Sequence, residues 1–423
     1  MATFTAEVFQ NEFLPDGGSD VHAIVTVTCV GAGEAGKTGA GDAGEVVVVD
    51  TSGSMGQTKI RAVQQAAAAA LDQVHDGVWF AVIAGNHVAR MAYPSSGPRA
   101  MVRMDDQARA AAKAAIGGFV PDGGTAMGTW LHLATQVFAD IPGLAQKHAI
   151  LLTDGINQHE TPQQLTAAIE GARGQFQCDC RGVGADWQVA EVRRIATALL
   201  GSVDLIAAPE NMAADFEQIM RESMGRGVAE AWLRVWAPQG AEVLFVRQVS
   251  PTVDDLTGRR TEVNALTSAY PTGSWGDEAR DYHVAVRLAA KAVGQEQLAA
   301  RVQLAVGTEV VAQGLVKAMW SGDDTLTTRI DPAVAHYTGQ AELAEAIQDG
   351  LAAKAAGDTA TATTKLGRAV QLAAETGNDE ATTRLRKIVD VDDGGTVRLR
   401  RAVDKLDEMA LDTASTKTTR VKK

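Results

Sequence analysis

A cluster of oxygen donors follows the most apolar run of the chain. Residues 46–55, VVVVDTSGSM, pass from four valines directly into Asp50, Ser52 and Ser54, which together form a D-x-S-x-S pattern. The valine run is typical of a strand buried on both faces. In an open parallel sheet, binding sites form beyond the carboxyl ends of the strands. We therefore expect this strand to deliver one carboxylate and two hydroxyls to such an edge.

Two later stretches are expected at the same edge. Residues 123–125, GGT, precede a predicted helix and supply Thr125, and residues 151–155, LLTDG, end a predicted strand and supply Asp154. Carboxylates and hydroxyls are hard donors, and this set suits Mg²⁺, with Mn²⁺ or Ca²⁺ as alternatives. The sequence predicts a metal site with a coordination position left for water or for a carboxylate of another molecule.

The elements that must position these residues alternate between strand and helix. Across 45–224, short apolar runs alternate with helical periodicity, which predicts an α/β fold with a doubly wound parallel sheet. The predicted strands are 46–49, 78–84, 148–153, 180–183 and 205–208. The predicted helices are 58–74, 106–119, 128–138, 162–171, 189–200 and 211–224.

The flanking segments have different patterns. Residues 1–44 read as a β-hairpin followed by a Gly-rich linker, and 228–330 as six strands, so we expect a β-sandwich into which the α/β domain is inserted. Residues 338–410 predict a C-terminal α-helical domain, with a third helix at 380–389 and a fourth at 396–409. The Thr-rich tail, 411–423, has few apolar residues and is predicted to be disordered.

DTSGSM, GGT and LLTDG, in this order, resemble the metal-ion-dependent adhesion site of von Willebrand factor type A domains. The resemblance covers about residues 45–223 and extends to KIRAVQQAAAAAL, DGVWFAVIAGN and CRGVGADW. It implies that Ser52 and Ser54 bind Mg²⁺ directly and Thr125 directly or through water. Asp50 would belong to the first loop of the site, and Asp154 would act through water. In the family, an acidic residue of a protein partner often completes the metal shell.

Alternative interpretations remain open for several of these motifs. The D-x-S-x-S cluster, Thr125 and Asp154 could be helix caps or turns, or the site could be retained without an adhesive role. The G-x-x-x-x-G-K-T spacing at 31–38 matches a phosphate-binding loop, but it lies in a linker without the required strand and helix. Cys178-x-Cys180 could hold zinc, although two small thiols in a strand are the favoured interpretation.

The composition excludes several function classes. The 423 residues carry a net charge of -13, so neither nucleic acid nor an anionic membrane is expected as a partner. The N-terminus lacks a basic region followed by an apolar stretch, and no apolar run is long enough for membrane insertion. Three cysteines suit a reducing compartment. We therefore expect a cytoplasmic protein, and the Ala, Gly, Asp and Val bias suggests a bacterial source.

Three hypotheses for function follow. The first is a non-enzymatic scaffold that binds a protein carboxylate through Mg²⁺; the family association suggests a kinase and phosphatase signalling context. The second is an accessory subunit of an AAA, MoxR- or chelatase-type ATPase. The third, a metal-dependent hydrolase, has no obvious nucleophile or base. In the tail, Thr416, Thr418 and Thr419 among basic residues are candidate phosphorylation sites for a Ser/Thr kinase or a phosphothreonine-reading partner.

Overall fold

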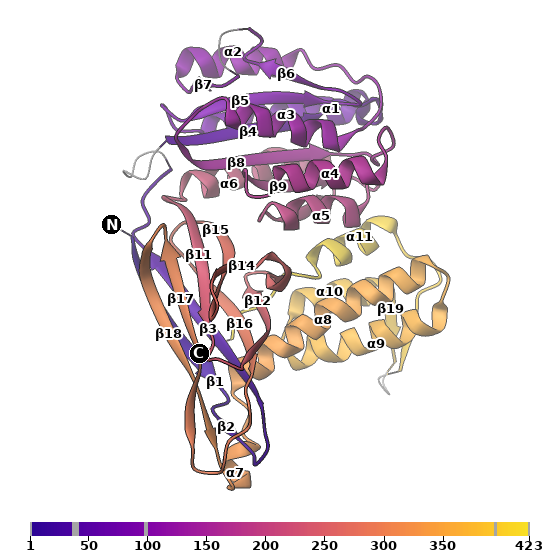
Figure 1. Cartoon of the computed structure of the whole chain (residues 1–423). Helices are drawn as coiled ribbons and strands as arrows, with labels where there is room; N and C mark the ends of the chain where they lie inside the picture. Colours follow the sequence, from indigo (N-terminus) through magenta and orange to yellow (C-terminus); the bar gives the residue numbers. More distant parts are fainter. Residues whose placement is uncertain (1, 36–41, 97–99, 393–395, 422–423) are drawn as a thin grey trace. The chain divides into compact units, whose positions relative to one another are not determined.

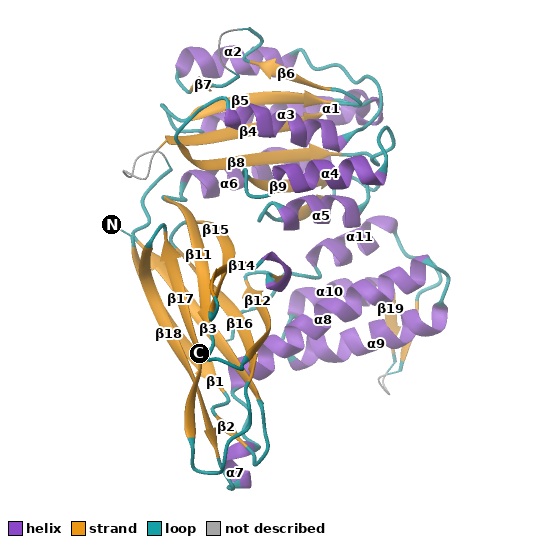
Figure 2. Cartoon of the chain, in the orientation of Figure 1, coloured by secondary structure: helices purple, strands orange, loops and turns teal. Residues whose placement is uncertain are grey.

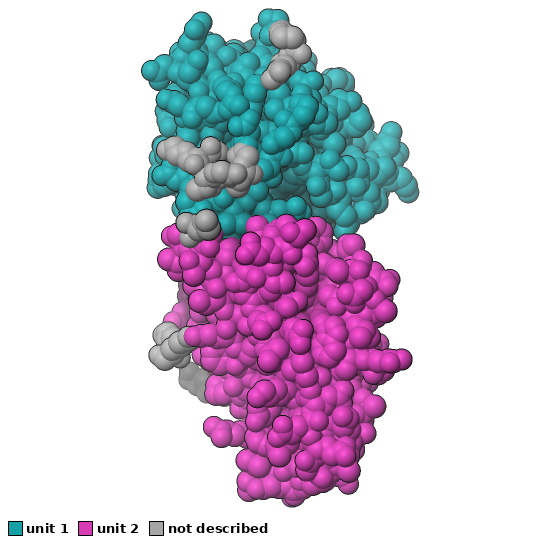
Figure 3. Space-filling model, turned by 60° about the vertical axis from the view of Figure 1, so that its left-hand side comes forward, with its two compact units in different colours: residues 1, 32–230, 273–276 teal, residues 2–31, 231–272, 277–423 magenta. Residues whose placement is uncertain are grey.

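The computed structural model describes residues 2–35, 42–96, 100–392 and 396–421. Their contacts divide into two compact units (Figures 1 and 3). Unit 1 takes in 32–230 and 273–276, and unit 2 takes in 2–31, 231–272 and 277–423, within those described ranges. The chain thus leaves unit 2, builds unit 1 and returns to unit 2. The last three residues of the phosphate-loop spacing at 31–38 lie outside the described residues.

Unit 1 contains a seven-stranded sheet in the order β10-β9-β8-β4-β5-β6, with β7 paired to β5. Its strands are β4 (Asp42–Asp50), β5 (Trp79–Gly85), β6 (Ala89–Tyr93), β7 (Val102–Arg103), β8 (Leu144–Thr153), β9 (Gln177–Val183) and β10 (Val203–Ile206). β4, β5, β8, β9 and β10 pair in parallel. The predicted parallel α/β sheet is confirmed, and β6 and β7 extend it as antiparallel strands that the sequence pattern did not predict.

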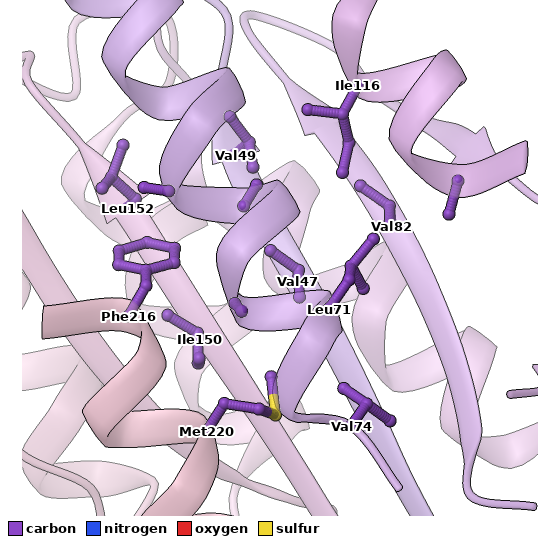
Figure 4. Packing of buried hydrophobic residues seen from close by; sticks show 14 of the residues in the cluster. Val47, Val49, Leu71, Val74, Val82, Ile116, Ile150, Leu152, Phe216 and Met220 are labelled. Carbon is purple, nitrogen blue, oxygen red and sulfur yellow. The ribbon is translucent and has the colours of Figure 1, made fainter. Parts of the chain in front are cut away.

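Helices cover both faces of this sheet (Figure 2). They are α1 (Gly56–Gln73), α2 (Asp106–Gly117), α3 (Met127–Ala139), α4 (Pro162–Ala172), α5 (Val189–Ala198) and α6 (Met212–Met224). On one face, Val47 and Val49 of β4 join a core with α1, α2 and α6, including Leu71 and Phe216 (Figure 4). Val46 and Val48 point to the opposite face and are equally buried. Burial on both faces explains the uninterrupted valine run before the oxygen cluster.

Unit 2 contains two sheets made by both ends of the chain. One has the order β1-β3-β16-β12-β13, and the other β14-β15-β11-β17-β18-β2. The amino-terminal strands are β1 (Thr3–Gln10), β2 (Phe13–Leu14) and β3 (Asp20–Val30). The later strands are β11 (Val228–Trp236), β12 (Glu242–Ser250), β13 (Asp254–Asp255), β14 (Thr261–Asn264), β15 (Thr267–Trp275), β16 (Glu278–Arg287), β17 (Glu296–Val306) and β18 (Glu309–Trp320). β3 joins β16 and β2 joins β18, so the amino-terminal segment contributes to both sheets.

The helices of the carboxyl-terminal region belong to unit 2 as well. They are α7 (Asp324–Thr327), α8 (Pro332–Ala355), α9 (Thr359–Glu375), α10 (Asp379–Ile388) and α11 (Lys405–Ala414). The helix predicted over 396–409 was wrong in its first half, because β20 (Val397–Leu399) pairs there with β19 (Val389–Val391). The alternation of Val397 and Leu399 suits a short strand, which the helical context of this region obscured.

The predicted disorder of the tail, 411–423, was also wrong for the residues that the structure describes. Helix α11 continues to Ala414. Beyond it, the Thr418 hydroxyl donates to the Val249 carbonyl at 2.7 Å, and the Gln340 amide donates to the Thr419 hydroxyl at 3.1 Å. Arg420 forms two hydrogen bonds with the carboxylate of Asp281. Polar contacts order this segment, whereas the composition argument counted only apolar residues that could be buried.

Candidate metal site

The first loop of the site begins where β4 ends. Asp50 is fully buried, and one of its carboxylate oxygens accepts a hydrogen bond from the backbone N–H of Ser52 at 2.7 Å. The backbone N–H of Thr51 donates to the carbonyl of Gly85 at the end of β5, also at 2.7 Å. A short 3-10 turn, Gly53–Met55, then leads into α1. The loop is therefore fixed from both sides, and it holds the hydroxyls of Ser52 and Ser54 2.9 Å apart.

The second loop, which contains Thr125, is bonded directly to the first. The Gly53 N–H donates to the Gly123 carbonyl at 2.9 Å, and the Asp122 N–H donates to the Thr51 carbonyl at 2.8 Å. Gly123 has φ +71°, and a Cβ there would lie 2.3 Å from Nδ1 of His87. Glycine is therefore required at this close approach.

The third segment follows β8 and joins the first loop through side chains. The Ser54 hydroxyl donates to Oδ1 of Asp154 at 2.7 Å, and Asp154 is fully buried. The Thr153 hydroxyl donates to Oδ2 of Asp50, also at 2.7 Å. The carboxyl ends of β4 and β8 are thus connected by hydroxyl-to-carboxylate hydrogen bonds.

Gly155 shows how closely the oxygens converge. A Cβ on Gly155 would lie 3.1 Å from Oγ1 of Thr125, 3.2 Å from Oγ of Ser54 and 3.9 Å from Oδ2 of Asp50. Asp50 and Ser54 belong to the first loop and Thr125 to the second, while Gly155 itself follows Asp154 in the third segment. With Ser52 and Asp154 hydrogen-bonded to Ser54, the structure brings all five sequence-predicted residues together at one point.

Helix capping does not explain these residues. No side chain caps the 3-10 turn at Ser52 or the start of α1 at Met55. Helix α3, which follows Thr125, has Ala126 at its N-cap position, again without a side-chain cap. Its first N–H groups are instead satisfied by side chains of the 156–160 loop, with Asn157 accepting from Met127 at 2.9 Å and Glu160 accepting from Gly128 at 2.7 Å.

Burial sets the electrostatics of the cluster. The pKa of Asp50 is raised to about 6, chiefly by burial and to a smaller extent by the nearby Asp154 charge, while hydrogen bonds from Ser52 and Thr153 partly oppose the shift. A carboxylate in this position is short of positive charge. A hard divalent cation would supply that charge, and the donor set of two carboxylates and three hydroxyls fits one.

Sequence reasoning missed one cation and the role of one loop. The ammonium of Lys59 on α1 lies 2.6 Å from Oδ2 of Asp154. The position of Lys59 in the sequence, nine residues after Asp50, gave no indication that it would contact Asp154. His159 and Glu160 hold the second loop and the start of α3: Nδ1 of His159 accepts from the Thr125 N–H at 3.3 Å, and the Glu160 carboxylate accepts from the Gly128 N–H at 2.7 Å.

The zinc alternative has no support in the described residues. Cys178 and Cys180 are buried with their sulfur atoms 3.8 Å apart. Within the parts of the chain that the structure describes, no group of three or more His, Cys, Asp or Glu side chains could hold a metal ion. The oxygen cluster is not a group of that kind, because three of its five members are Ser or Thr residues.

Known proteins are similar to this chain in sequence and in fold. A model of the von Willebrand factor type A domain matches residues 46–157, and one of the von Willebrand factor type A C-terminal domain matches residues 371–415. The solved structure of a von Willebrand factor type A protein from Catenulispora acidiphila is 47% identical, with a TM-score of 0.94 over 99% of this chain and 97% of that chain. The chain belongs to the von Willebrand factor type A family. Domains of this family commonly mediate metal-dependent protein interactions.

Two other proteins are similar to this chain at lower sequence identity. An uncharacterized protein of Synechocystis sp. is 30% identical over 217 residues, which is 50% of this chain. The chain covers about half the length of that curated relative, 49%. The ArnB paralog VWA2 from Sulfolobus acidocaldarius is 15% identical, with a TM-score of 0.58 over 98% of this chain and 100% of that one, so it shares the fold. Among the described residues of this chain, the helices are too short or too polar to cross a membrane.

Proposed function

We propose that this protein is a scaffold that binds a partner protein through a divalent metal, Mg²⁺ by preference, and that it is not an enzyme. The observation that carries the proposal is the convergence of Asp50, Ser54 and Thr125 around Gly155. The first loop supplies the oxygens of Asp50 and Ser54, and the second supplies that of Thr125. Asp154 of the third loop accepts a hydrogen bond from Ser54, which is also hydrogen-bonded to Ser52. Helix capping, the main structural alternative, does not use these oxygens.

The roles of the individual residues follow from their contacts. Ser52 and Ser54 would present their hydroxyls to the cation, and Thr125 would do so from the second loop. Asp50 and Asp154 supply negative charge, and each accepts a hydrogen bond from a hydroxyl, Asp50 from Thr153 and Asp154 from Ser54. When bound, the cation would act as a Lewis acid that accepts an oxygen of a partner carboxylate. Ser54 is exposed, which provides access for that carboxylate.

A non-catalytic role is supported by the chemistry at the rim. The imidazole of His159 accepts a backbone N–H and the carboxylate of Glu160 accepts another, so both side chains are engaged in holding the α3 end of the site. We propose a cytoplasmic setting, with which the free, buried thiols of Cys29, Cys178 and Cys180 are compatible. A screen of the pure protein for ATPase and phosphatase turnover is expected to show none; turnover that Asp50→Asn abolishes would contradict the proposal.

The binding function is tested by affinity capture in three arms. Wild type with Mg²⁺, wild type with EDTA and Thr125→Ala with Mg²⁺ are compared, and bound proteins are read by mass spectrometry. Thr129→Ala is the matched control, because Thr129 lies in the first turn of α3 and its hydroxyl donates to the Ala126 carbonyl outside the cluster. We expect a partner that binds wild type and Thr129→Ala in Mg²⁺ and that is missing from the EDTA and Thr125→Ala samples. The same proteins in all arms would contradict the proposal.

A further inference from the structure

Lys59 is a cation built into the oxygen cluster. It lies on α1, and its ammonium is 2.6 Å from Oδ2 of Asp154, whose carboxylate is fully buried. The other oxygen of Asp154, Oδ1, accepts from Ser54. Asp154 therefore faces the candidate metal ligands through one oxygen and Lys59 through the other.

On the side away from Asp154, the Lys59 ammonium has neighbours in the loop between β9 and α5. The ammonium lies 3.7 Å from Asp186, whose side chain is 72% exposed, whereas the Lys59 side chain is 24% exposed. A Cβ on Gly184 would come to 3.9 Å from its ammonium nitrogen, so the β9–α5 loop passes close by. Exposure and salt screen the pair with Asp186, whereas Asp154 is fully buried, so its pair with Lys59 is screened less and the two charges interact more strongly.

The charges in direct contact do not balance. Asp50 and Asp154 carry two negative charges and Lys59 carries one positive charge, which leaves the cluster with one negative charge. A divalent cation would bring the total to one positive charge. Without Lys59, the same loaded cluster would be neutral. The lysine therefore opposes the entry of a cation but favours the later approach of an anion.

We propose that Lys59 sets the charge of the loaded site, lowering its affinity for the divalent cation and raising its affinity for the carboxylate of a partner. This inference rests on the proposed function, because it concerns the same metal and the same carboxylate. It makes Lys59 a specificity residue: cation binding alone is weakened, so the full complex forms best when an acidic partner is present.

A purely structural role predicts something else. If Lys59 only anchored α1 to β8, its loss would lower the free energy of unfolding and weaken cation and carboxylate binding together or leave both unchanged. Effects of opposite sign on the two affinities arise only if the charge of Lys59 acts on both ligands. The test therefore measures both affinities in the same variants.

The test uses Mn²⁺ as the cation and acetate as the carboxylate. Isothermal titration of the EDTA-treated, dialysed full chain gives the Mn²⁺ affinity, and water-proton relaxation of the Mn²⁺-loaded protein during acetate addition gives the carboxylate affinity. The variants are Lys59→Gln, Lys59→Arg, which keeps the charge, and Arg61→Gln. Arg61 is exposed and two residues along α1, so it matches the charge change on a different helix face.

For Lys59→Gln we expect Mn²⁺ to bind about tenfold more tightly and acetate about tenfold more weakly, as expected for one unit charge removed a few ångströms away. Lys59→Arg and Arg61→Gln should stay within about twofold of wild type for both ligands. Urea denaturation identifies any variant whose folding has changed. If Lys59→Gln misfolds, Lys59→Met, which keeps the apolar stem, is measured in its place.

The outcomes separate this inference from the proposed function. If wild type binds Mn²⁺ and Lys59→Gln binds it equally or more weakly, the role of Lys59 is wrong while the metal site stands. The same holds if acetate binding is unchanged or strengthened in Lys59→Gln. If wild type binds no Mn²⁺, the proposed function fails and this inference fails with it.

Discussion

The strands β4 and β8 carry a buried charged cluster at each end, and the two clusters differ in how completely they are paired. Toward the start of β4, His148 bridges Glu45 at 2.7 Å and Asp179 at 2.9 Å, and all three are buried. The Ser223 hydroxyl donates to the second oxygen of Glu45, and the Ser202 hydroxyl donates to the second oxygen of Asp179. Every carboxylate oxygen of this inner cluster therefore has a partner from within the protein.

The oxygen cluster at the other end of the same strands is short of positive charge. Asp50 accepts only from neutral donors, Ser52 and Thr153, and Lys59 contacts Asp154. The pKa directions follow this difference. Burial alone would lower the pKa of His148, but Glu45 and Asp179 outweigh it and raise the pKa to about 9. Burial raises the pKa of Asp50 to about 6. A buried cluster with complete internal pairing is structural, whereas one with a charge deficit points to a ligand.

The largest effect is expected from breaking the inner cluster. His148→Gln removes the charge that pairs two buried carboxylates, and loss of one partner of a buried ion pair typically destabilises by about 3–5 kcal/mol. Urea denaturation should show this loss, while Mn²⁺ affinity at the other end of the strands should stay within about twofold. A loss of stability under about 1 kcal/mol, or a large change in Mn²⁺ affinity, would remove the distinction between the two clusters.

The inner cluster should also make stability depend on pH. The folded-state pKa of His148, about 9, lies above its ordinary value of 6.5. Its stabilisation is therefore fully present below pH 6.5 and is lost as the pH rises through 9, by up to about 3 kcal/mol from the size of the shift. Urea midpoints between pH 6 and 10 measure this. His148→Gln should flatten that part of the curve, and an unchanged slope in the variant would assign the effect to other groups.

A substitution in the oxygen cluster should do the reverse of one in the inner cluster: it should weaken Mn²⁺ binding and leave stability nearly unchanged. Asp50→Asn should weaken Mn²⁺ binding at least about 100-fold, or about 2.7 kcal/mol, because it removes a charge that faces the cation. In EDTA, the variant should be as stable as wild type or slightly more so, since a buried carboxylate with a raised pKa is replaced by a neutral amide. Thermal unfolding with and without Mn²⁺ measures both effects. A variant that retains wild-type stabilisation by Mn²⁺ would show that Asp50 is not part of a metal site.

A smaller effect is expected where the oxygens converge. Gly155→Ala places a methyl group 3.1 Å from Oγ1 of Thr125 and 3.2 Å from Oγ of Ser54, so both must move by a few tenths of an ångström. We expect Mn²⁺ affinity to fall by about tenfold while unfolding changes by less than about 1 kcal/mol. Gly171→Ala is the matched control, because a Cβ on Gly171 meets open space. Gly174 would not serve, since its φ of +71° would strain any alanine placed there. Equal effects of the two substitutions would contradict the convergence.

The smallest effect concerns the tail of unit 2. Thr418→Val removes a hydroxyl that donates to the carbonyls of Val249, at 2.7 Å, and Pro251, at 3.1 Å, and should destabilise by about 1 kcal/mol. Because this hydroxyl is engaged, phosphorylation of Thr418 requires the tail to detach first. Incubation of the intact chain with a Ser/Thr kinase should therefore modify Thr416 faster than Thr418. Faster modification of Thr418 would show that its contacts are weak.

Sequence patterns predicted the parts of the molecule that depend on local periodicity. The buried run at 46–49 and the strand before Asp154 placed their oxygens at one sheet edge because parallel strands end together. The contact of Lys59 with Asp154 and the pairing of His148 with Glu45 depend on side chains about a hundred positions apart, which no local pattern encodes. The strands β6 and β20 were missed because short edge and hairpin strands bury little surface and carry weak alternation.

The most direct test of the central claim is a crystal structure of the full chain grown with Mn²⁺, with anomalous data collected at the manganese edge. We expect one strong anomalous peak at the carboxyl ends of β4 and β8, about 2.2 Å from the hydroxyl oxygens of Ser52 and Ser54 and absent in Asp50→Asn. A map without a peak there, or with its strongest peak elsewhere on the molecule, would contradict the assignment of these residues as a metal site.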